Sequence, residues 1–210
     1  GSINLTVSAI NDAPVLTVPG TQNVGEDGSL SFSSGNAIPN AVSVADVDAL
    51  TDSIQVTLTV TNGLLSLSTD SGLTFSNGAS MDSGSMTFTG MTTAINTALD
   101  GLTYVPTANF NGTAMLNLLV NDLGENGNGG AQTDSDSVTI NVTPSNDPPT
   151  ALGDSYVVLQ GQTLTVNDPT AGDANNRNDG VLVNDSDIDG DNLTAITVTD
   201  PANHSGIFTL

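Results

Sequence analysis

A short segment occurs twice in this chain, and the spacing of the two copies limits the folds that the chain can adopt. Residues 10–14 read Ile-Asn-Asp-Ala-Pro and residues 145–149 read Ser-Asn-Asp-Pro-Pro, so that Asn146 lies 135 residues after Asn11. The alternating runs before the two copies, at residues 3–7 and 138–142, also match. An Asn-Asp pair and a proline directly after such a run are typical of a last strand followed by a stiff connector. The repeat therefore indicates tandem modules of about 135 residues.

The repeat also defines the expected domain organisation. We expect residues 1–10 to be the last strand of a preceding module or its remnant, with residues 3–9 as an isolated alternating strand. Residues 11–146 should form one complete module, and residues 147–210 the first half of a second, incomplete module. Because a half-sandwich leaves strand groups unpaired and an apolar face uncovered, this last segment is not expected to be a finished domain.

Short strand-like runs and turn residues fill the complete module. Residues 25–28 indicate a turn, and Asn62-Gly63 predicts a hairpin after the cleanly alternating run at 54–60. Ile95 and Leu99 lie four residues apart among good helix formers, so residues 92–99 are the one plausible helix. The sequence therefore predicts an all-β fold of immunoglobulin-like Greek-key β-sandwich modules in tandem, with one short helix in the complete module. The expected strands are residues 15–18, 30–32, 42–44, 54–60, 64–67, 86–88, 102–105, 114–120 and 137–142.

The pattern restarts after the second copy of the connector. Residues 157–166 stand where the first two strands of the complete module stood, and a polar stretch at 167–180 follows. Asp187-Ile188-Asp189 then matches Asp46-Val47-Asp48. Residues 193–198 match the strand from 54, and residues 205–210 match 62–67. The chain is thus expected to stop about halfway through its second module.

Charge excludes whole classes of partner. The chain has 23 acidic residues and a single base, Arg177, which gives a formal net charge of −22. Nucleic acids and anionic membrane surfaces are therefore excluded as partners. Cysteine is absent, so neither disulfides nor thiolate metal sites can form. No window approaches the length of a membrane span, and we expect no direct membrane insertion.

Aspartate dominates the acidic residues, since only Glu26 and Glu125 are glutamates. Turns and calcium sites prefer aspartate. In an immunoglobulin-like sandwich, two of the loops lie at the end where the chain enters, and the first turn lies where it leaves. At the first junction we therefore expect a cluster of Asn11, Asp12, Asp46, Asp48 and Asp122. At the second junction we expect Glu26, Asn146, Asp147, Asp187 and Asp189.

Carboxylates that converge without a lysine repel one another unless a hard cation lies between them, and oxygen ligands favour Ca²⁺. Repulsion relieved by loop flexibility stays open as the alternative. The run from Asp185 to Asp191 also fits the first half of an EF-hand loop, with acids at its first, third and fifth places. Because Ile196 takes the twelfth place and strands flank the run, we expect a calcium-binding turn that includes Asp185, and not an EF-hand. Asp134 and Asp136 are either further ligands or a solvated strand start.

Several of these motifs together resemble the calcium motifs of cadherin repeats. They are residues 120–124, Val-Asn-Asp-Leu-Gly, with Asp46-x-Asp48, Glu26 and the Asn-Asp-x-Pro connectors. The spacing and the turn at residues 109–112, Asn-Phe-Asn-Gly, resemble more closely the bacterial cadherin-like repeats strung in tandem in giant secreted adhesins of the RTX type. The resemblance implies a calcium-rigidified extender in an extracellular adhesion protein, with neighbouring repeats as its partners and a cell-surface or matrix ligand for the whole protein.

The sequence departs from the cadherin pattern at named positions. Ala9 and Pro144 stand two residues before the connector asparagines, where cadherins carry an acid, and the Leu-Asp-Arg-Glu motif has no match. Gln160 takes the place of Glu26 in the second module. These departures imply that each junction binds fewer calcium ions than a cadherin junction, or binds them more weakly.

Three other functions were weighed against the calcium-bound extender. Enzyme activity is not expected, because the single histidine, His204, lies in the incomplete module and no cysteine is available. Carbohydrate binding is disfavoured because few aromatic side chains are available to stack on a sugar ring. The chain has two tyrosines, five phenylalanines and no tryptophan. Self-cleavage could use an Asp-Pro bond, at Asp147-Pro148, Asp168-Pro169 or Asp200-Pro201. The three Asp-Pro bonds lie in unrelated sequence contexts, which favours a role in turns over a role in self-cleavage.

Overall fold

The structure, a computed structural model, describes residues 3, 7–49, 51–124, 127–157, 159–162 and 180–194. The chain divides into two compact units, Gly1–Ser145 (unit 1) and Asn146–Leu210 (unit 2). Within the described ranges, every strand and the single α-helix belong to unit 1. The elements of unit 1 are β1 (Val15–Thr17), β2 (Gln22–Gly25), β3 (Leu30–Phe32), β4 (Ser43–Ala45), β5 (Ser53–Val60), β6 (Gly63–Ser66), β7 (Thr74–Asn77), β8 (Ser85–Met91), α1 (Thr92–Leu99), β9 (Leu102–Pro106), β10 (Gly112–Asn121) and β11 (Thr133–Thr143).

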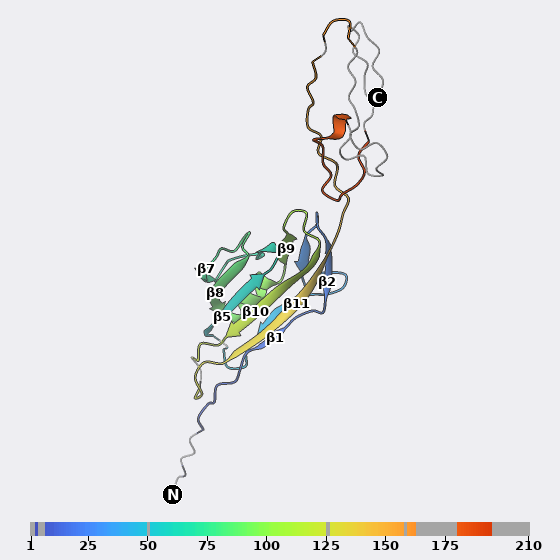
Figure 1. The fold of residues 1–210 in the computed structure, drawn as a ribbon. Helices are drawn as coiled ribbons and strands as arrows, with labels where there is room; N and C mark the ends of the chain where they lie inside the picture. Colours follow the sequence, from blue (N-terminus) through green and yellow to red (C-terminus); the bar gives the residue numbers. More distant parts are fainter. Residues whose placement is uncertain are drawn as a thin grey trace. The chain divides into compact units, whose positions relative to one another are not determined.

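Unit 1 is an all-β sandwich. One layer is a six-stranded sheet in the order β2-β11-β10-β5-β8-β7, whose central strands lie side by side in Figure 1. The other layer holds a three-stranded sheet, β3-β9-β6, and a two-stranded sheet, β1-β4. Only β2 pairs in parallel, with β11, while every other pair of strands is antiparallel. The all-β sandwich with one short helix that the sequence predicts is confirmed.

Alternation along the central strands builds the core. In β10, each second residue from Ala114 to Val120 is buried and the residues between them are exposed. The matching sides of β5 and β8 bury residues such as Leu58 and Phe88 with no exposed surface. Against them lie Phe32 and Tyr104 of the second layer, which are equally buried. Apolar area taken from water at these positions supplies most of the stability of the sandwich.

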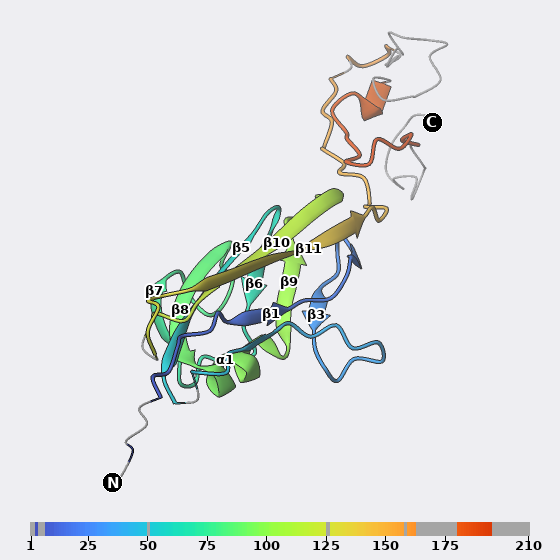
Figure 2. The same cartoon turned by 90° about the horizontal axis from the view of Figure 1, so that it is seen from below.

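The predicted helix forms as α1, directly after β8. It buries Ile95, Ala98 and Leu99, because these positions share one face of a helix. Figure 2 shows α1 and β1 on the same side of β11. No helix of the described residues is long and apolar enough to cross a membrane.

Side chains complete the short strands whose backbone groups would otherwise lack partners. The Asn96 amide of α1 accepts a hydrogen bond from the Val44 N–H and donates one to the Val44 carbonyl, both at 2.8 Å, as a neighbouring strand would. Asp134 accepts from the N–H of Leu16 in β1 at 2.8 Å. Asn40 donates to the carbonyl of Ser31 in β3 at 3.0 Å. These bonds satisfy backbone groups of β1, β3 and β4 that could otherwise pair with another strand.

Asn62-Gly63 does not form the predicted hairpin. β5 and β6 belong to different sheets, so the turn carries the chain across the core. Asn62 has a φ of 55°, and its carbonyl accepts a hydrogen bond from the Tyr104 hydroxyl at 2.8 Å. A Cβ on Gly63 would meet the Tyr104 ring at 2.2 Å, so the glycine serves close packing. The dipeptide signals a tight turn, but the destination of the next strand depends on packing.

Two further strand predictions need correction. Described residues 3 and 7–9 lie in no strand, and Ile10 instead forms a single parallel bridge to Asn128. The first expected strand is followed by a second one, β2, which joins β11 in the opposite layer. β7, the edge strand beside β8, is not among the predicted strands.

Unit 2 has little regular structure in the part that is described. It contains one 3-10 turn, η1 (Gly180–Leu182), and an antiparallel bridge between Thr150 and Ser186. Residues 157–166 were predicted to take the place of the first two strands, and of these, residues 157 and 159–162 are described and lie in no strand. Residues 193 and 194 likewise lie in no strand, whereas 195–198 and 205–210 lie outside the described residues.

We predict that Asn96→Ala lowers the free energy of unfolding by about 1–3 kcal/mol, because it leaves the N–H and carbonyl of Val44 without partners. Urea denaturation followed by circular dichroism would measure the change. Thr93→Ala, at an exposed position of the same helix, is the matched control and should change the stability little. Equal loss in both variants would show that the Asn96 amide is not needed at β4.

Candidate metal centre

The connector asparagine Asn11 is buried, with 4% of its surface exposed. Its side-chain Nδ2 donates to Asp122 Oδ2 at 2.6 Å and to the Gly130 carbonyl at 2.9 Å. Its backbone N–H donates to the Asn128 carbonyl at 3.0 Å, and its own carbonyl accepts from the side chain of Gln132. The loop after β10 therefore holds Asn11 from both its backbone and its side chain.

Asp122 is the acidic centre of this arrangement, with 4% of its surface exposed. Its Oδ1 accepts from the N–H of Gln132 at 2.7 Å and of Gly124 at 2.9 Å, while Oδ2 accepts from Asn11. Burial by itself raises the pKa of Asp122, but these hydrogen bonds outweigh it and lower the pKa below its ordinary value. The carboxylate is thus held in its charged form without a cationic side chain.

The next connector residue, Asp12, is held by the loop after β4. Its N–H donates to Asp48 Oδ2 at 2.7 Å. Asp46 Oδ1 in turn accepts from the N–H of Asp48 at 2.9 Å and of Ala49 at 3.1 Å, which fixes the loop as an Asx turn. All five residues predicted for the first junction therefore take part in hydrogen bonds at the N-terminal end of unit 1.

One oxygen in this loop stands out. Asp46 Oδ2 is buried and forms no hydrogen bond with any residue that the structure describes. A buried carboxylate oxygen without a partner costs free energy, roughly 1–3 kcal/mol or more when the group is charged. Such an oxygen is suited to a ligand that supplies positive charge.

The carboxylates at this end of unit 1 do not form a closed cage. Among the described residues of unit 1, no three carboxylates offer oxygen atoms that all lie within 4.8 Å of one another. The groups available to an ion are nevertheless all oxygens, from Asp12, Asp46 and Asp48, and this donor set fits Ca²⁺, which takes 6–8 oxygen ligands including carbonyls and water.

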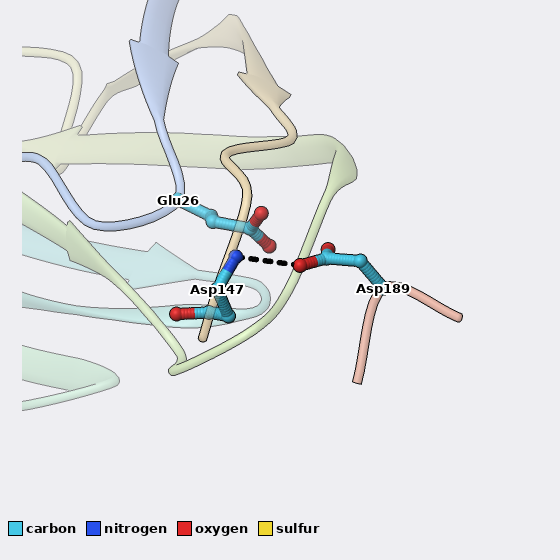
Figure 3. Close-up of side chains that lie close together, drawn as sticks. All are labelled: Glu26, Asp147 and Asp189. Carbon is cyan, nitrogen blue, oxygen red and sulfur yellow. Dashed lines mark hydrogen bonds between the residues drawn. The ribbon is translucent and has the colours of Figure 1, made fainter. Parts of the chain in front are cut away.

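Glu26 lies in the turn after β2, where the sequence analysis placed it (Figure 3). Its N–H donates to the Thr143 carbonyl at 3.0 Å. Its Oε1 accepts from the N–H of Ser145, the last residue of unit 1, at 2.6 Å, and Asn111 Nδ2 lies 3.5 Å from Oε2. Glu26 therefore holds the chain at the point where β11 has ended.

In unit 2, the connector residue Asp147 is held by the loop that was predicted to bind calcium. Its N–H donates to Asp189 Oδ2 at 2.6 Å, the dashed line in Figure 3. One carboxylate oxygen of Asp147 lies within 4.8 Å of one of Asp189. Asp187 Oδ1 accepts from the N–H of Asp189 at 2.9 Å and of Asp191 at 3.2 Å.

The two units thus contain the same local arrangement. In each, the second connector residue donates its N–H to the last acid of an Asp-x-Asp segment, Asp48 in unit 1 and Asp189 in unit 2. The first acid of the segment then accepts from the N–H of the last one, at 2.9 Å in both units. The repeat seen in the sequence is therefore also a repeat of hydrogen bonds.

The remaining predicted residues of unit 2 have local partners. Asp185 Oδ1 accepts from the N–H of Leu152 at 2.8 Å. Asn146 donates from its side chain to the Asp147 carbonyl at 3.2 Å. The segment that carries Asp187, Asp189 and Asp191 turns at Gly190. The φ of Gly190 is 84°, a backbone conformation that favours glycine. Asp168 and Asp200, of the other Asp-Pro bonds, lie outside the described residues.

Sequence reasoning missed three residues that fix the connector, namely Asn128, Gly130 and Gln132. They lie more than 115 residues from Asn11, in a glycine-rich loop that gives no periodic signal. Asp134, left open as a ligand or a solvated residue, instead accepts from the N–H of Leu16 in β1. Only the folded arrangement of the loops shows these contacts.

Comparisons with known proteins do not assign a family. No family model and no curated protein matches the chain. One similar solved structure, "ASH / PapD-like domain of human CEP192 (PapD-like domain 7)", is 8% identical, covers 69% of this chain and 95% of its own, and has a TM-score of 0.29. A likeness of this size carries no argument, so the sandwich assignment rests on the sheets themselves.

We predict that Asp122→Asn lowers the stability at neutral pH by about 1–3 kcal/mol, because one amide cannot accept the three hydrogen bonds of the carboxylate. Since the folded state lowers the pKa of Asp122, its contribution is complete above the ordinary value of 3.8 and is lost as the pH falls below it. The difference in stability between parent and variant should therefore shrink in acid. Urea denaturation at several pH values would measure it.

Asp70→Asn, at an exposed aspartate on the same unit, serves as the control and should change stability little at any pH. A difference between parent and Asp122→Asn that stays constant from neutral to acid pH would contradict the role given to the charged carboxylate.

Proposed function

We propose that this chain is a piece of a calcium-rigidified extender, in which cadherin-like modules repeat in tandem within a large extracellular adhesin. The observation that carries the proposal is Asp46 Oδ2, a buried carboxylate oxygen without a partner among the described residues. It lies in the loop whose neighbouring acid, Asp48, holds the connector. A divalent cation would compensate this oxygen and at the same time bind the connector.

Electrostatics favour a cation at this end of unit 1. The chain has a formal net charge of −22, and Asp12, Asp46, Asp48 and Asp122 belong to loops that share the connector. Two like charges at 4 Å repel by about 4 kcal/mol at an effective dielectric constant of 20. A bound Ca²⁺ would replace this repulsion by attraction, so the loops and the connector would become more rigid.

The repeated arrangement supports the same role in the second connector. Asp147 is held through its N–H by Asp189, as Asp12 is by Asp48. We therefore assign a second calcium site to the connector and loop residues of unit 2, which are Asn146, Asp147, Asp187 and Asp189, with a contribution from the Asp185 turn. An ion bound by connector side chains would select one connector conformation, which is what an extender requires.

The biological setting follows from the resemblance to bacterial cadherin-like repeats and belongs to the same proposal. The partners of each module would be its neighbours in the chain, and the whole protein would act outside the cell, on a cell-surface or matrix ligand. We assign the chain a structural and not a catalytic role.

We predict that Ca²⁺ raises the melting temperature of the protein. A ligand at about 100 times its Kd adds about 2.7 kcal/mol to the stability. For a domain of this size, each kcal/mol corresponds to about 2–4 °C. Calorimetry with Ca²⁺ and with EGTA would measure the shift, with Mg²⁺ as the matched control ion. Melting curves that coincide in Ca²⁺ and EGTA would overturn the proposal.

We further predict that Asp46→Asn acts in opposite directions in the two conditions. In EGTA it should leave the stability unchanged or raise it, because it removes the charge from a carboxylate whose Oδ2 is buried without a partner, while an amide oxygen can still accept the two N–H groups bound to Oδ1. In Ca²⁺ it should lower the affinity by about tenfold or more, equivalent to about 1.4 kcal/mol. Isothermal titration calorimetry and melting curves would separate the two effects.

The matched control is Asp70→Asn, which removes the same charge from an exposed position away from the connector. If both variants bind Ca²⁺ as tightly as the parent, the loop after β4 is not part of a calcium site.

A further inference from the structure

The outward face of the six-stranded sheet has a different chemistry from the rest of this acidic chain. Its central strands present neutral side chains outward, which are Thr57 and Thr59 on β5, Asn117 and Leu119 on β10, and Ser135 and Ser137 on β11. These residues line a shallow groove of about 550 Å³, together with Leu118 and Asp136. The volume is within the usual range for small-molecule sites, roughly 300–1,000 Å³.

Strand pairing arranges these side chains in two rows across the sheet. Asn117 is paired with Thr59 on one side and with Ser137 on the other. Leu119 is paired in the same way with Thr57 and Ser135. Neighbouring strands lie about 4.8 Å apart, and residues two apart along a strand lie about 6.8 Å apart. The groove thus offers a grid of hydroxyl and amide groups around one aliphatic side chain.

Much of the hydrogen-bonding capacity of this grid is open. Among the described residues, the hydroxyls of Ser135 and Ser137 form no hydrogen bond, although the backbone N–H groups of both serines donate to Asp134 and Asp136. The Thr57 hydroxyl is bonded to the Thr87 hydroxyl of β8 at 3.1 Å. The Asn117 amide has one long contact, 3.5 Å from Nδ2 to Thr59 Oγ1. Ser135, Ser137 and Asn117 therefore provide both donors and acceptors to a ligand.

We propose that this groove binds a neutral oligosaccharide. Sugar hydroxyls both donate and accept, as the grid requires, and the exposed Leu119, 43% exposed, can contact the C–H face of a sugar ring. Asp136 and the net charge of −22 disfavour anionic ligands. None of the described residues that line the groove is aromatic, so these residues offer no ring for stacking, and the Kd should be on the order of 1 mM.

The test is a titration of the ¹⁵N-labelled 210-residue protein with maltotetraose, cellotetraose and mannotetraose, to about ten times the expected Kd. The expected result is a saturable shift of the amide signals of Thr57, Asn117, Ser135 and Ser137 with at least one of these sugars. The shifts should persist in EGTA, because the groove is built on strands and not on the acidic loops. This proposal therefore stands or falls separately from the calcium site.

Asn117→Ala should weaken the sugar about fivefold, the loss expected for one hydrogen bond. The matched control is Asn141→Ala, an asparagine on the same face of β11 outside the groove, which should leave the affinity unchanged. Absence of a saturable shift with all three sugars would overturn the proposal. A second outcome would also overturn it: amide signals of the groove residues that shift when the protein is diluted without sugar. Such shifts would mean that a second copy of the chain occupies the groove.

Discussion

Hydrogen bonds from backbone N–H groups to aspartate side chains hold the loops of this protein in place. With one arginine and no lysine against 23 acids, carboxylates have almost no cationic partners within the chain. They are bound instead by N–H groups, as at Asp122 and at Oδ1 of Asp46, or by hydroxyls, as at Asp100, where donation from Ser34 and then Ser33 lowers the pKa of the carboxyl. An Asp side chain is short enough to reach the backbone of its own turn, which explains why aspartate outnumbers glutamate.

This way of holding loops also bears on the metal binding that we propose. A carboxylate that accepts N–H groups through one oxygen keeps the other oxygen available, and at Asp46 that second oxygen is buried. The loop is therefore already shaped before an ion arrives, so binding would cost less conformational entropy. Under the proposed function, the same preorganisation would let the connector bind calcium without a change of fold.

The second organising feature is the difference between the side chains on the two faces of the six-stranded sheet. The inward face is aliphatic and the outward face is neutral and polar, while the acids are concentrated in the loops. Short strands end against side chains such as Asn96 and Asp134, which take the place of a neighbouring strand.

Elements with strong local signals can be predicted from the amino-acid sequence. The alternation at residues 54–60 and 114–120 specifies β5 and β10, and the spacing of Ile95 and Leu99 specifies α1. The repeated connector and the Asp-x-Asp segments were also readable, and their pairing at Asp12 and Asp48 follows from the loop order of a sandwich. In each case the information lies within one turn, one strand or one known topology.

Which sheet each short strand joins depends on packing between distant parts of the chain. β2 and β6 are too short to specify a partner, so packing places β2 on β11 and sends the chain across the core at Asn62-Gly63. The contacts of Gln132 with Asn11 and the orphan oxygen of Asp46 depend on loops far apart in the sequence. Hydrogen bonds of this kind leave no periodic pattern, because they are fixed by where the strands end in space.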